Sequence, residues 1–203
     1  ALSTQPPAQR PAISRKAVAA AVAGNALEFY DFVIYAYFAV YIGHTFFPVS
    51  GEYGSLLVAV AVFGVGFFTR PLGGLLIGAF ADRAGRKPAM ILTVALITIG
   101  TLGLAATPSY ASIGIAAPVI VVLCRLVQGL ALGGEVGPAT ALLLEAAPAG
   151  RRGFYSSFPY VTGIAGQLVA ICVLLALQTM LAPAQLDAWG WRIQGMIGGA
   201  LAV

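Results

Sequence analysis

The stretch GFFTRPLGGLLIGAFADRAGRK, residues 66–87, decides the fold. It is an apolar segment that carries one arginine, Arg70, and ends in a short charged turn at residues 82–87. An isolated arginine in an apolar helix is costly in a bilayer unless it faces a protein interior or a watery cavity. The turn is too short and too charged to lie in lipid. The stretch therefore predicts an aqueous hairpin between two membrane-spanning helices.

The composition indicates a membrane protein, because 60% of the 203 residues are hydrophobic and only 9% are charged. Soluble domains carry about 25% charged residues, so a water-soluble fold is excluded. The net charge of +4 does not indicate a nucleic-acid partner, because the basic residues stand in small groups between apolar runs. Cys124 and Cys172 lie inside such runs, and we expect both to be free, buried thiols.

Six apolar runs follow a polar, Pro-rich tail of residues 1–16, which we expect to be disordered. They predict an all-α membrane protein with one six-helix bundle over residues 17–203. The expected spans are about 17–43, 54–81, 88–106, 112–146, 154–181 and 191–203. At about 1.5 Å per residue, the first five can cross a hydrocarbon core of about 30 Å. The sixth offers roughly 20 Å of helix, so we expect it to be incomplete and more chain to follow.

The positions of lysine and arginine predict the orientation. The loops at about 44–53, 107–112 and 182–190 contain neither residue. The tail and the other two loops contain Arg10, Arg15, Lys16, Arg83, Arg86, Lys87, Arg151 and Arg152. By the positive-inside rule, the N-terminus and both charged loops lie in the cytoplasm. Trp189 and Trp191 are then expected at the outer interface as aromatic anchors.

Charged residues also stand near the middle of the predicted spans: Glu28, Asp31, Arg70, Arg125 and Glu135. At about 100° per residue, Glu28, Asp31 and Tyr35 lie within about 60° of one another. With Asn25 they form a polar stripe on the first span. On the fourth span, Gln128 and Glu135 fall within about 20°, and Arg125 lies about 60° from Gln128.

Two interpretations of these charges are open. In the first, the acids and arginines form permanent pairs that hold helices together. In the second, they line a pathway for a solute and a proton, and the concentration of costly groups at one depth favours it. A carboxylate beside an arginine in a low-dielectric site can change its protonation when the arginine finds another partner. Coupling of a proton to a solute requires such a change.

Glycine spacing predicts close helix packing. Gly74 and Gly78 on the second span, and Gly129 and Gly133 on the fourth, have the small-xxx-small spacing that lets helix backbones approach. We expect packing rather than ligand contact from these residues.

With these residues in view, the chain resembles the major facilitator superfamily and, within it, the metabolite:proton symporters of the citrate, α-ketoglutarate, shikimate and proline–betaine type. The hairpin GAFADRAGRK matches the family signature at Gly78, Asp82, Arg83, Gly85, Arg86 and Lys87. Other similar segments are GNALEFYDF (24–32), TRPLGG (69–74), RLVQGLALGGEVG (125–137), LLLEAAPAGRRGFYSSFP (142–159) and WGWRI (189–193). The resemblance covers nearly everything from Gly24 to Ile193.

The resemblance implies two six-helix halves around a central cavity, with alternating access by rocking of the halves. This chain looks like the N-terminal half. The residues implied in proton coupling are Asp31, with Arg125 as its partner, and Glu28 and Glu135. The residues expected to meet the solute are Arg70, Arg125, Gln128, Tyr35 and Asn25. The gating set is the six hairpin residues together with Glu145 and Arg152.

The expected function is therefore proton-coupled symport of a small organic acid or zwitterion in a bacterial inner membrane. The sequence contains no metal cluster, nucleophile–base pair or phosphate loop, so we expect no enzyme, no metal and no cofactor, with H⁺ as the coupling ion. The expected partners are the solute, the lipid bilayer and the missing C-terminal half. The alternatives are an uncoupled facilitator and a non-transporting membrane module that needs a second chain.

Overall fold

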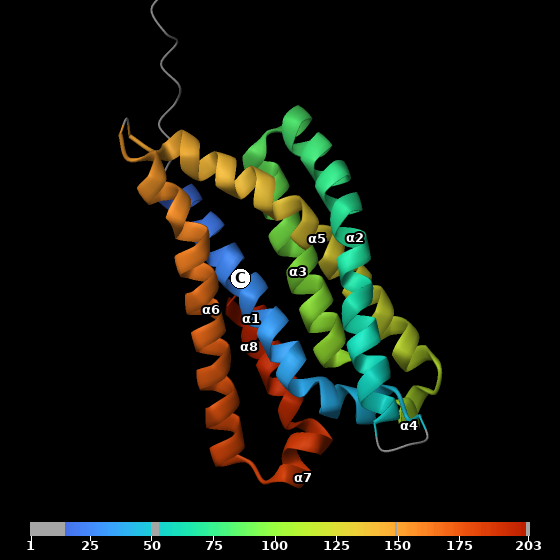
Figure 1. Ribbon diagram of the computed structural model, residues 1–203. Helices are drawn as coiled ribbons and strands as arrows, with labels where there is room; N and C mark the ends of the chain where they lie inside the picture. The colour runs from blue at the N-terminus through green and yellow to red at the C-terminus, as the bar shows by residue number, and fades with distance from the viewer. Residues whose placement is uncertain (1–14, 50–52, 149, 202–203) are drawn as a thin grey trace, which may run out of the picture.

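The charged hairpin joins two long helices in the computed structural model, which describes residues 15–49, 53–148 and 150–201 (Figure 1). Helix α2 (Gly54–Ala84) ends at Gly85, whose φ of 97° is a conformation that residues with a Cβ rarely adopt. Helix α3 (Arg86–Ala106) begins directly after this glycine. A single glycine therefore reverses the chain between the two helices.

The other elements are α1 (Arg15–Phe46), α4 (Tyr110–Ile113), α5 (Ala116–Ala146), α6 (Arg152–Met180), α7 (Pro183–Gln185), the π-helical turn η1 (Leu186–Gly190) and α8 (Trp191–Leu201). Within the described residues, five helical segments are long and apolar enough to cross a bilayer: Val22–Phe46, Gly54–Ala84, Arg86–Ala106, Ala116–Glu135 and Arg152–Met180. Helix α8, with 11 residues, is not among them. The all-helical membrane fold that the sequence predicts is confirmed.

Several helix ends differ by a few residues from the sequence-based expectation. Helix α1 continues to Phe46 rather than ending near residue 43, and α5 begins at Ala116 rather than near residue 112. The short helix α4 precedes α5, and Gly114, with a φ of 60°, separates the two. An apolar run does not reveal this break, because Gly114 is as compatible with an apolar run as any small residue.

The helices pack in two groups. Helix α5 lies against α2 and α3, whereas α1 lies against α6, and α8 packs on α3 and α1. Figure 1 shows the α2–α3 and α5–α6 connections at one end of the bundle and α4 and α7 at the other. The basic residues of both charged loops therefore gather at a single end.

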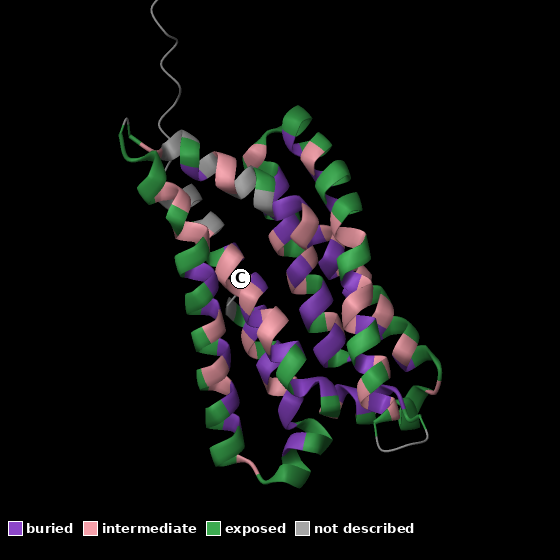
Figure 2. Cartoon of the chain, in the orientation of Figure 1, coloured by how far each residue is buried: buried purple, intermediate pink, exposed green. Residues whose placement is uncertain are grey.

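Aromatic side chains of α1 fill the centre of the bundle. Tyr30, Tyr35, Phe38 and Phe46 are each no more than 2% exposed. The outward faces of α2 and α6 carry the opposite pattern, with large exposed apolar residues such as Phe68 (Figure 2). A helix that is apolar on its outer face needs lipid or another apolar surface to cover it.

Two expectations about buried and interfacial residues are wrong. Trp191 is fully buried against Phe46, with ring centroids 5.5 Å apart, and is not an interfacial anchor; Trp189 is 47% exposed. Cys124 and Cys172 are both free, but Cys172 is exposed on α6 and Cys124 is only half-buried. The reason is that an apolar run does not distinguish the lipid-facing side of a helix from its core-facing side.

Helices α2 and α5 approach each other backbone to backbone. A Cβ added at Gly73 would overlap the backbone of Leu130, and one added at Gly133 would overlap that of Arg70. The packing role predicted for Gly133 is confirmed. Gly78 takes no part, since, apart from its chain neighbours and the adjacent backbone of α2, no described atom lies within 4 Å of the position of its missing Cβ.

We expect Gly73→Ala to destabilise the bundle and Gly64→Ala, on the same helix, to leave it unchanged. Overpacking at a tight contact costs about 1–3 kcal/mol. At residue 64, by contrast, no described atom other than the chain neighbours and the adjacent backbone of α2 lies within 4 Å of an added Cβ. Thermal unfolding of each purified variant in detergent measures the difference. Equal unfolding temperatures for the two variants would contradict the close approach of α2 and α5.

Candidate functional site

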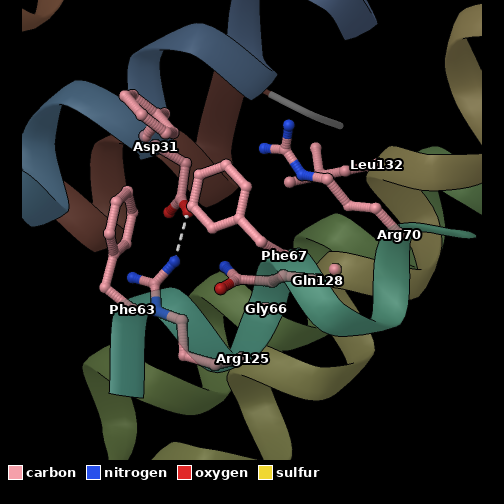
Figure 3. A pocket seen from close by; sticks show the side chains of 10 residues that line it. Asp31, Phe63, Gly66, Phe67, Arg70, Arg125, Gln128 and Leu132 are labelled. Carbon is pink, nitrogen blue, oxygen red and sulfur yellow. Dashed lines mark hydrogen bonds and ion pairs between the residues drawn. The ribbon is translucent and has the colours of Figure 1, made fainter. Parts of the chain in front are cut away.

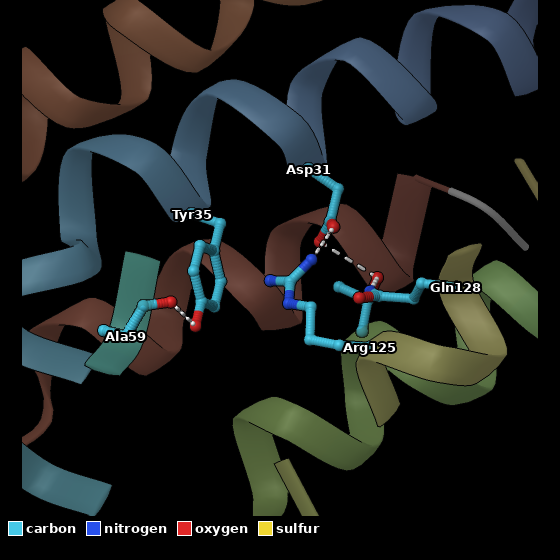
Figure 4. A network of polar contacts seen from close by, with 6 residues as sticks. Asp31, Tyr35, Ala59, Arg125 and Gln128 are labelled. Atoms are coloured by element: carbon cyan, nitrogen blue, oxygen red, sulfur yellow. Dashed lines mark hydrogen bonds and ion pairs between the residues drawn. The ribbon is translucent and has the colours of Figure 1, made fainter. Parts of the chain in front are cut away.

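The candidate site is built around an ion pair between α1 and α5. Arg125 Nη1 donates to Asp31 Oδ2 over 3.0 Å, and the two side chains are 6% and 15% exposed (Figure 4). Asp31 stands near the middle of α1, and Arg125 stands near the middle of the candidate span Ala116–Glu135, so the pair lies deep in the bundle. The pairing that the resemblance implied for these two residues is present in the structure.

The second oxygen of the Asp31 carboxylate also has a partner. Thr101 of α3 donates its hydroxyl to Asp31 Oδ1 over 3.1 Å. Gln128 of α5 in turn donates Nε2 to the Thr101 hydroxyl oxygen over 2.8 Å. The carboxylate therefore joins three helices, since α1 holds it and both α3 and α5 donate to it.

Tyr35 holds the other face of the arginine. Its ring centroid lies 3.7 Å from the Arg125 guanidinium carbon, a cation–π contact. The same ring stacks on Phe63 of α2 at 5.2 Å, and its hydroxyl donates to the Ala59 carbonyl over 3.1 Å. Tyr35 therefore packs its ring against the guanidinium of Arg125 and links α1 to α2.

A small hollow of about 20 Å³ opens beside the pair, which is room for about one water molecule. Asp31, Arg125 and Gln128 line one side of it, and Arg70 of α2 lies on the far side of Phe67 (Figure 3). The other lining residues are Phe32, Phe63, Gly66, Gly129 and Leu132. Three of the five predicted solute-binding residues thus meet at one hollow.

Several polar atoms around this hollow are unsatisfied. Arg70 Nε, Arg125 Nε and Gln128 Oε1 are buried and have no hydrogen-bond partner among the described residues. The Arg70 guanidinium carbon lies 4.3 Å from the centroid of the Phe67 ring. A buried donor or acceptor without a partner is destabilising, so these atoms are candidates for contact with an ordered water or a ligand. Two guanidinium groups beside one hollow suit a carboxylate.

Glu28 and Glu135 form a second acidic position, separate from the hollow. They are 8% and 2% exposed, and they are close enough to interact electrostatically, as are Glu28 and Arg70. Oε1 of Glu135 lies 2.7 Å from where a Cβ would stand on Gly24 of α1, so this carboxyl faces α1. Its Oε2 has no hydrogen-bond partner within the described part of the chain.

Asn25, which the sequence predicts to meet the solute, contacts α6 in the structure. Its Nδ2 donates to the Pro159 carbonyl over 2.6 Å and to the Thr162 hydroxyl over 2.8 Å. Both partners belong to α6, so Asn25 ties α1 to α6 rather than lining the hollow. On α1, the two ends of the predicted polar stripe thus face different neighbours.

The predicted gating residues lie at the end of the bundle where the charged loops gather. Asp82, Arg83, Lys87 and Arg152 are exposed, and Arg86 is half-buried. Gly85 forms the turn, and Gly78 lies one helical turn before Asp82. The side chain of Glu145 lies outside the described residues.

Sequence reasoning missed Thr101. A threonine in an apolar helix commonly donates to a carbonyl three or four residues earlier, as Thr93 and Thr98 do to Met90 and Val94. Nothing in the spacing separates Thr101 from these two. The sequence also did not predict that Phe63 and Phe67 line the hollow, because apolar residues are abundant throughout α2.

Comparison with known proteins gives a consistent set of relatives. The family described as "Sugar (and other) transporter" matches residues 16–203. The chain is 44% identical to the alpha-ketoglutarate permease of Escherichia coli (strain K12), over 92% of this chain and 43% of that protein. It is 40% identical to the citrate-proton symporter of Klebsiella pneumoniae, over 90% of this chain and 41% of that protein.

A third relative is the proline/betaine transporter of Salmonella typhimurium, 37% identical over 93% of this chain and 38% of that protein. The chain therefore spans about two fifths of the length of these curated relatives. Among solved structures, the partially occluded, inward-open xylose transporter XylE from E. coli superposes with a TM-score of 0.81. It is 22% identical and covers 91% of this chain and 46% of that one, so it supports the fold. All these names are those of transporters, not enzymes.

We expect Tyr35→Phe to weaken the bundle by about 1 kcal/mol, the usual worth of one hydrogen bond. Tyr35→Leu should weaken the bundle more, because it also removes the cation–π contact with Arg125 and the ring stacking on Phe63. Chemical or thermal unfolding in detergent measures both variants. A leucine variant as stable as the phenylalanine variant would show that the cation–π contact does not support the ion pair.

Proposed function

Because this chain belongs to the sugar (and other) transporter family of the major facilitator superfamily, we propose that it is the N-terminal half of a proton-coupled symporter for a small organic acid or zwitterion. The observation that carries the proposal is the buried Asp31–Arg125 pair beside a hollow with unsatisfied polar atoms. The relatives' names support it, since they include a citrate-proton symporter, an alpha-ketoglutarate permease and a proline/betaine transporter.

The proton acts at Asp31 in this proposal. Protonation removes the negative charge of Asp31, so Arg125 loses its ionic partner and becomes available to a carboxylate in the adjoining hollow. Binding of the anion then depends on the proton, which is the condition for symport. Glu28 and Glu135 are proposed as a second proton-coupling position, because two buried carboxyls that interact do not both stay ionised easily.

The solute is proposed to bind between the two arginines. Arg70 and Arg125 supply donors for a carboxylate, and Gln128 supplies an amide at the same hollow. Tyr35 acts through Arg125, which it holds from the opposite face. Asn25 is engaged with α6 and would reach the solute only after α1 and α6 move apart.

Transport is proposed to follow alternating access, with this bundle rocking against a C-terminal bundle of the same transporter. The exposed apolar faces of α2 and α6 would meet lipid and that second bundle. The charged end, with Asp82, Arg83, Arg86 and Lys87, would form the cytoplasmic gate, with Arg152 and Glu145 from the α5–α6 connection. We propose, from the positive-inside rule, that this end and the N-terminus lie on the cytoplasmic side of a bacterial inner membrane.

Asp31→Asn tests proton coupling in proteoliposomes that carry the complete transporter. A pH gradient of one unit drives at most about tenfold accumulation per coupled proton. We expect the variant to lose this accumulation and to keep exchange of solute across the membrane, because the asparagine cannot release a proton. Uptake of labelled citrate, α-ketoglutarate, proline and betaine provides the measurement. If Asp31→Asn accumulates solute as the wild type does, Asp31 has a structural role. If the wild type exchanges solute but shows no gradient-driven accumulation, the protein is a facilitator.

Arg70→Ala tests the solute side. Loss of a hydrogen bond to a charged group costs about 1.5–3 kcal/mol, so affinity for the transported acid should fall by about 10- to 100-fold. Arg151→Ala is the matched control, because Arg151 is exposed in the α5–α6 connection, away from the hollow. Binding of labelled α-ketoglutarate and citrate to purified protein measures both variants. If Arg70→Ala binds both acids as tightly as the wild type, Arg70 does not bind the solute and its role is the contact with Phe67.

A further inference from the structure

Thr101 links Gln128 to Asp31 through two hydrogen bonds, and the direction of each bond is defined. A threonine hydroxyl carries one hydrogen, and Thr101 gives it to Asp31 Oδ1 over 3.1 Å. Thr101 must therefore accept from Gln128, and the amide nitrogen Nε2 is the atom that faces it over 2.8 Å. The other end of the amide, Oε1, is left without a partner in the described part of the chain, although Gln128 is 2% exposed and lines the hollow.

We propose that Thr101 and Gln128 form a relay that reports the protonation state of Asp31 to the solute hollow. With Asp31 ionised, Thr101 donates to the carboxylate and Gln128 Nε2 donates to Thr101, so the amide oxygen of Gln128 is the end that has no partner in the described part of the chain. In this proposal, that oxygen is the end of the amide that a solute in the hollow meets, since Gln128 lines the hollow. With Asp31 protonated, its hydroxyl donates to Thr101, and Thr101 donates to the amide oxygen. A half-turn of the amide then places the NH₂ group of Gln128 in the hollow.

The reversal needs only small movements. The oxygen and nitrogen of a glutamine amide occupy nearly equivalent positions, so a half-turn exchanges them without moving the side chain. The hydroxyl hydrogen of Thr101 rotates to suit its partners. Both states keep both hydrogen bonds to Thr101, so within the relay itself only the free end of the Gln128 amide changes. The relay therefore changes the character of the hollow while the helices stay in place.

In the relay, protonation of Asp31 raises the affinity of the hollow for an anion, which is the direction that symport requires. This step rests on the proposed function. A carboxylate solute accepts hydrogen bonds and cannot donate one. An ionised Asp31 presents it with a carbonyl oxygen, which repels it, whereas a protonated Asp31 presents it with two N–H donors. Protonation of Asp31 thus raises the affinity of the hollow for an anion, and by linkage the bound anion raises the affinity of Asp31 for a proton.

The relay is distinct from the direct effect on Arg125, because it uses the other carboxylate oxygen. Arg125 contacts Oδ2, whereas Thr101 contacts Oδ1. The charged and titratable groups around Asp31 are Arg125 of α5, Arg70 of α2 across the hollow, and Glu28, Tyr30 and Tyr35 of α1. In the described part of the chain, α3 and α8 contribute neutral Thr101 and Gln194. Thr101 and Gln128 are positioning residues in this scheme, since neither exchanges the proton.

Infrared difference spectroscopy of the complete transporter in lipid, recorded as pH is lowered, tests the relay without a solute. The wild type should show the band of a protonated carboxyl, absent in Asp31→Asn, together with a shifted side-chain amide band, absent in Gln128→Leu. Thr101→Val keeps the shape of the side chain and removes its hydroxyl, so it should keep the carboxyl band and lose the amide shift. Thr101→Ser retains a hydroxyl and should keep both bands.

Thr93→Val controls for loss of a buried hydroxyl on the same helix. Thr93 is 1% exposed and donates to the Met90 carbonyl, away from the ion pair. It should leave both bands unchanged. An amide shift that persists in Thr101→Val, a wild type in which the carboxyl protonates without an amide shift, or an Asp31 band that never appears would each overturn the relay.

The affinity for α-ketoglutarate or citrate as a function of pH provides a second readout. One linked proton gives at most about a tenfold rise in affinity per pH unit of acidification. We expect the wild type and Thr101→Ser to share one slope and Thr101→Val to have a shallower one at similar folding stability. An unchanged slope in Thr101→Val would overturn the relay. Failure of both acids to bind the wild type would count against the proposed function, and the spectra would still decide the relay.

Discussion

The bundle depends on one buried ion pair. Asp31 and Arg125 are joined over 3.0 Å in the buried interior of the bundle, and removing ions from water is costly unless each finds close partners. Here the carboxylate receives donors on both oxygens, and the guanidinium lies on the Tyr35 ring. Breaking such a pair by removing one member typically costs about 3–5 kcal/mol. The positions of α1, α3 and α5 are therefore coupled to the charge of a single carboxyl group.

A second constraint places the solute arginine. Because Gly133 has no side chain, α5 lies directly on the backbone of α2 at Arg70, and Gly73 allows the same contact one turn later. The hydroxyl of Thr69 reinforces this contact by donating to the Leu126 carbonyl over 3.2 Å. Backbone packing of α2 on α5 therefore fixes the positions from which the two arginine side chains extend.

Much of this arrangement follows from the sequence, and the rest fails for identifiable reasons. Helical periodicity and the family resemblance together indicated Asp31, Arg125, Arg70 and Gln128, because charged groups in apolar helices are rare and costly. Periodicity gives the face of a helix but not the neighbour that the face meets, so it could not show that Asn25 contacts α6. The burial of Trp191 has the same origin, since interfacial and buried tryptophans have similar sequence surroundings. Thr101 required the structure, because a helical threonine ordinarily bonds to its own backbone.

Three of the five buried side-chain atoms that lack a hydrogen-bond partner within the described residues belong to residues that line the hollow, and the other two are Glu135 Oε2 and Trp191 Nε1. Away from the hollow, Tyr30 donates to the Gln194 carbonyl over 3.0 Å and Asn25 donates twice to α6, so these groups need no ligand. Around the hollow, Arg70, Arg125 and Gln128 each keep a buried atom without a partner among the described residues. Packing does not explain this concentration, because a small hydrophobic residue at any of these positions would avoid the penalty. Unsatisfied groups that converge on one space indicate a binding partner that brings donors and acceptors of its own, and a carboxylate supplies the acceptors that two guanidinium groups lack.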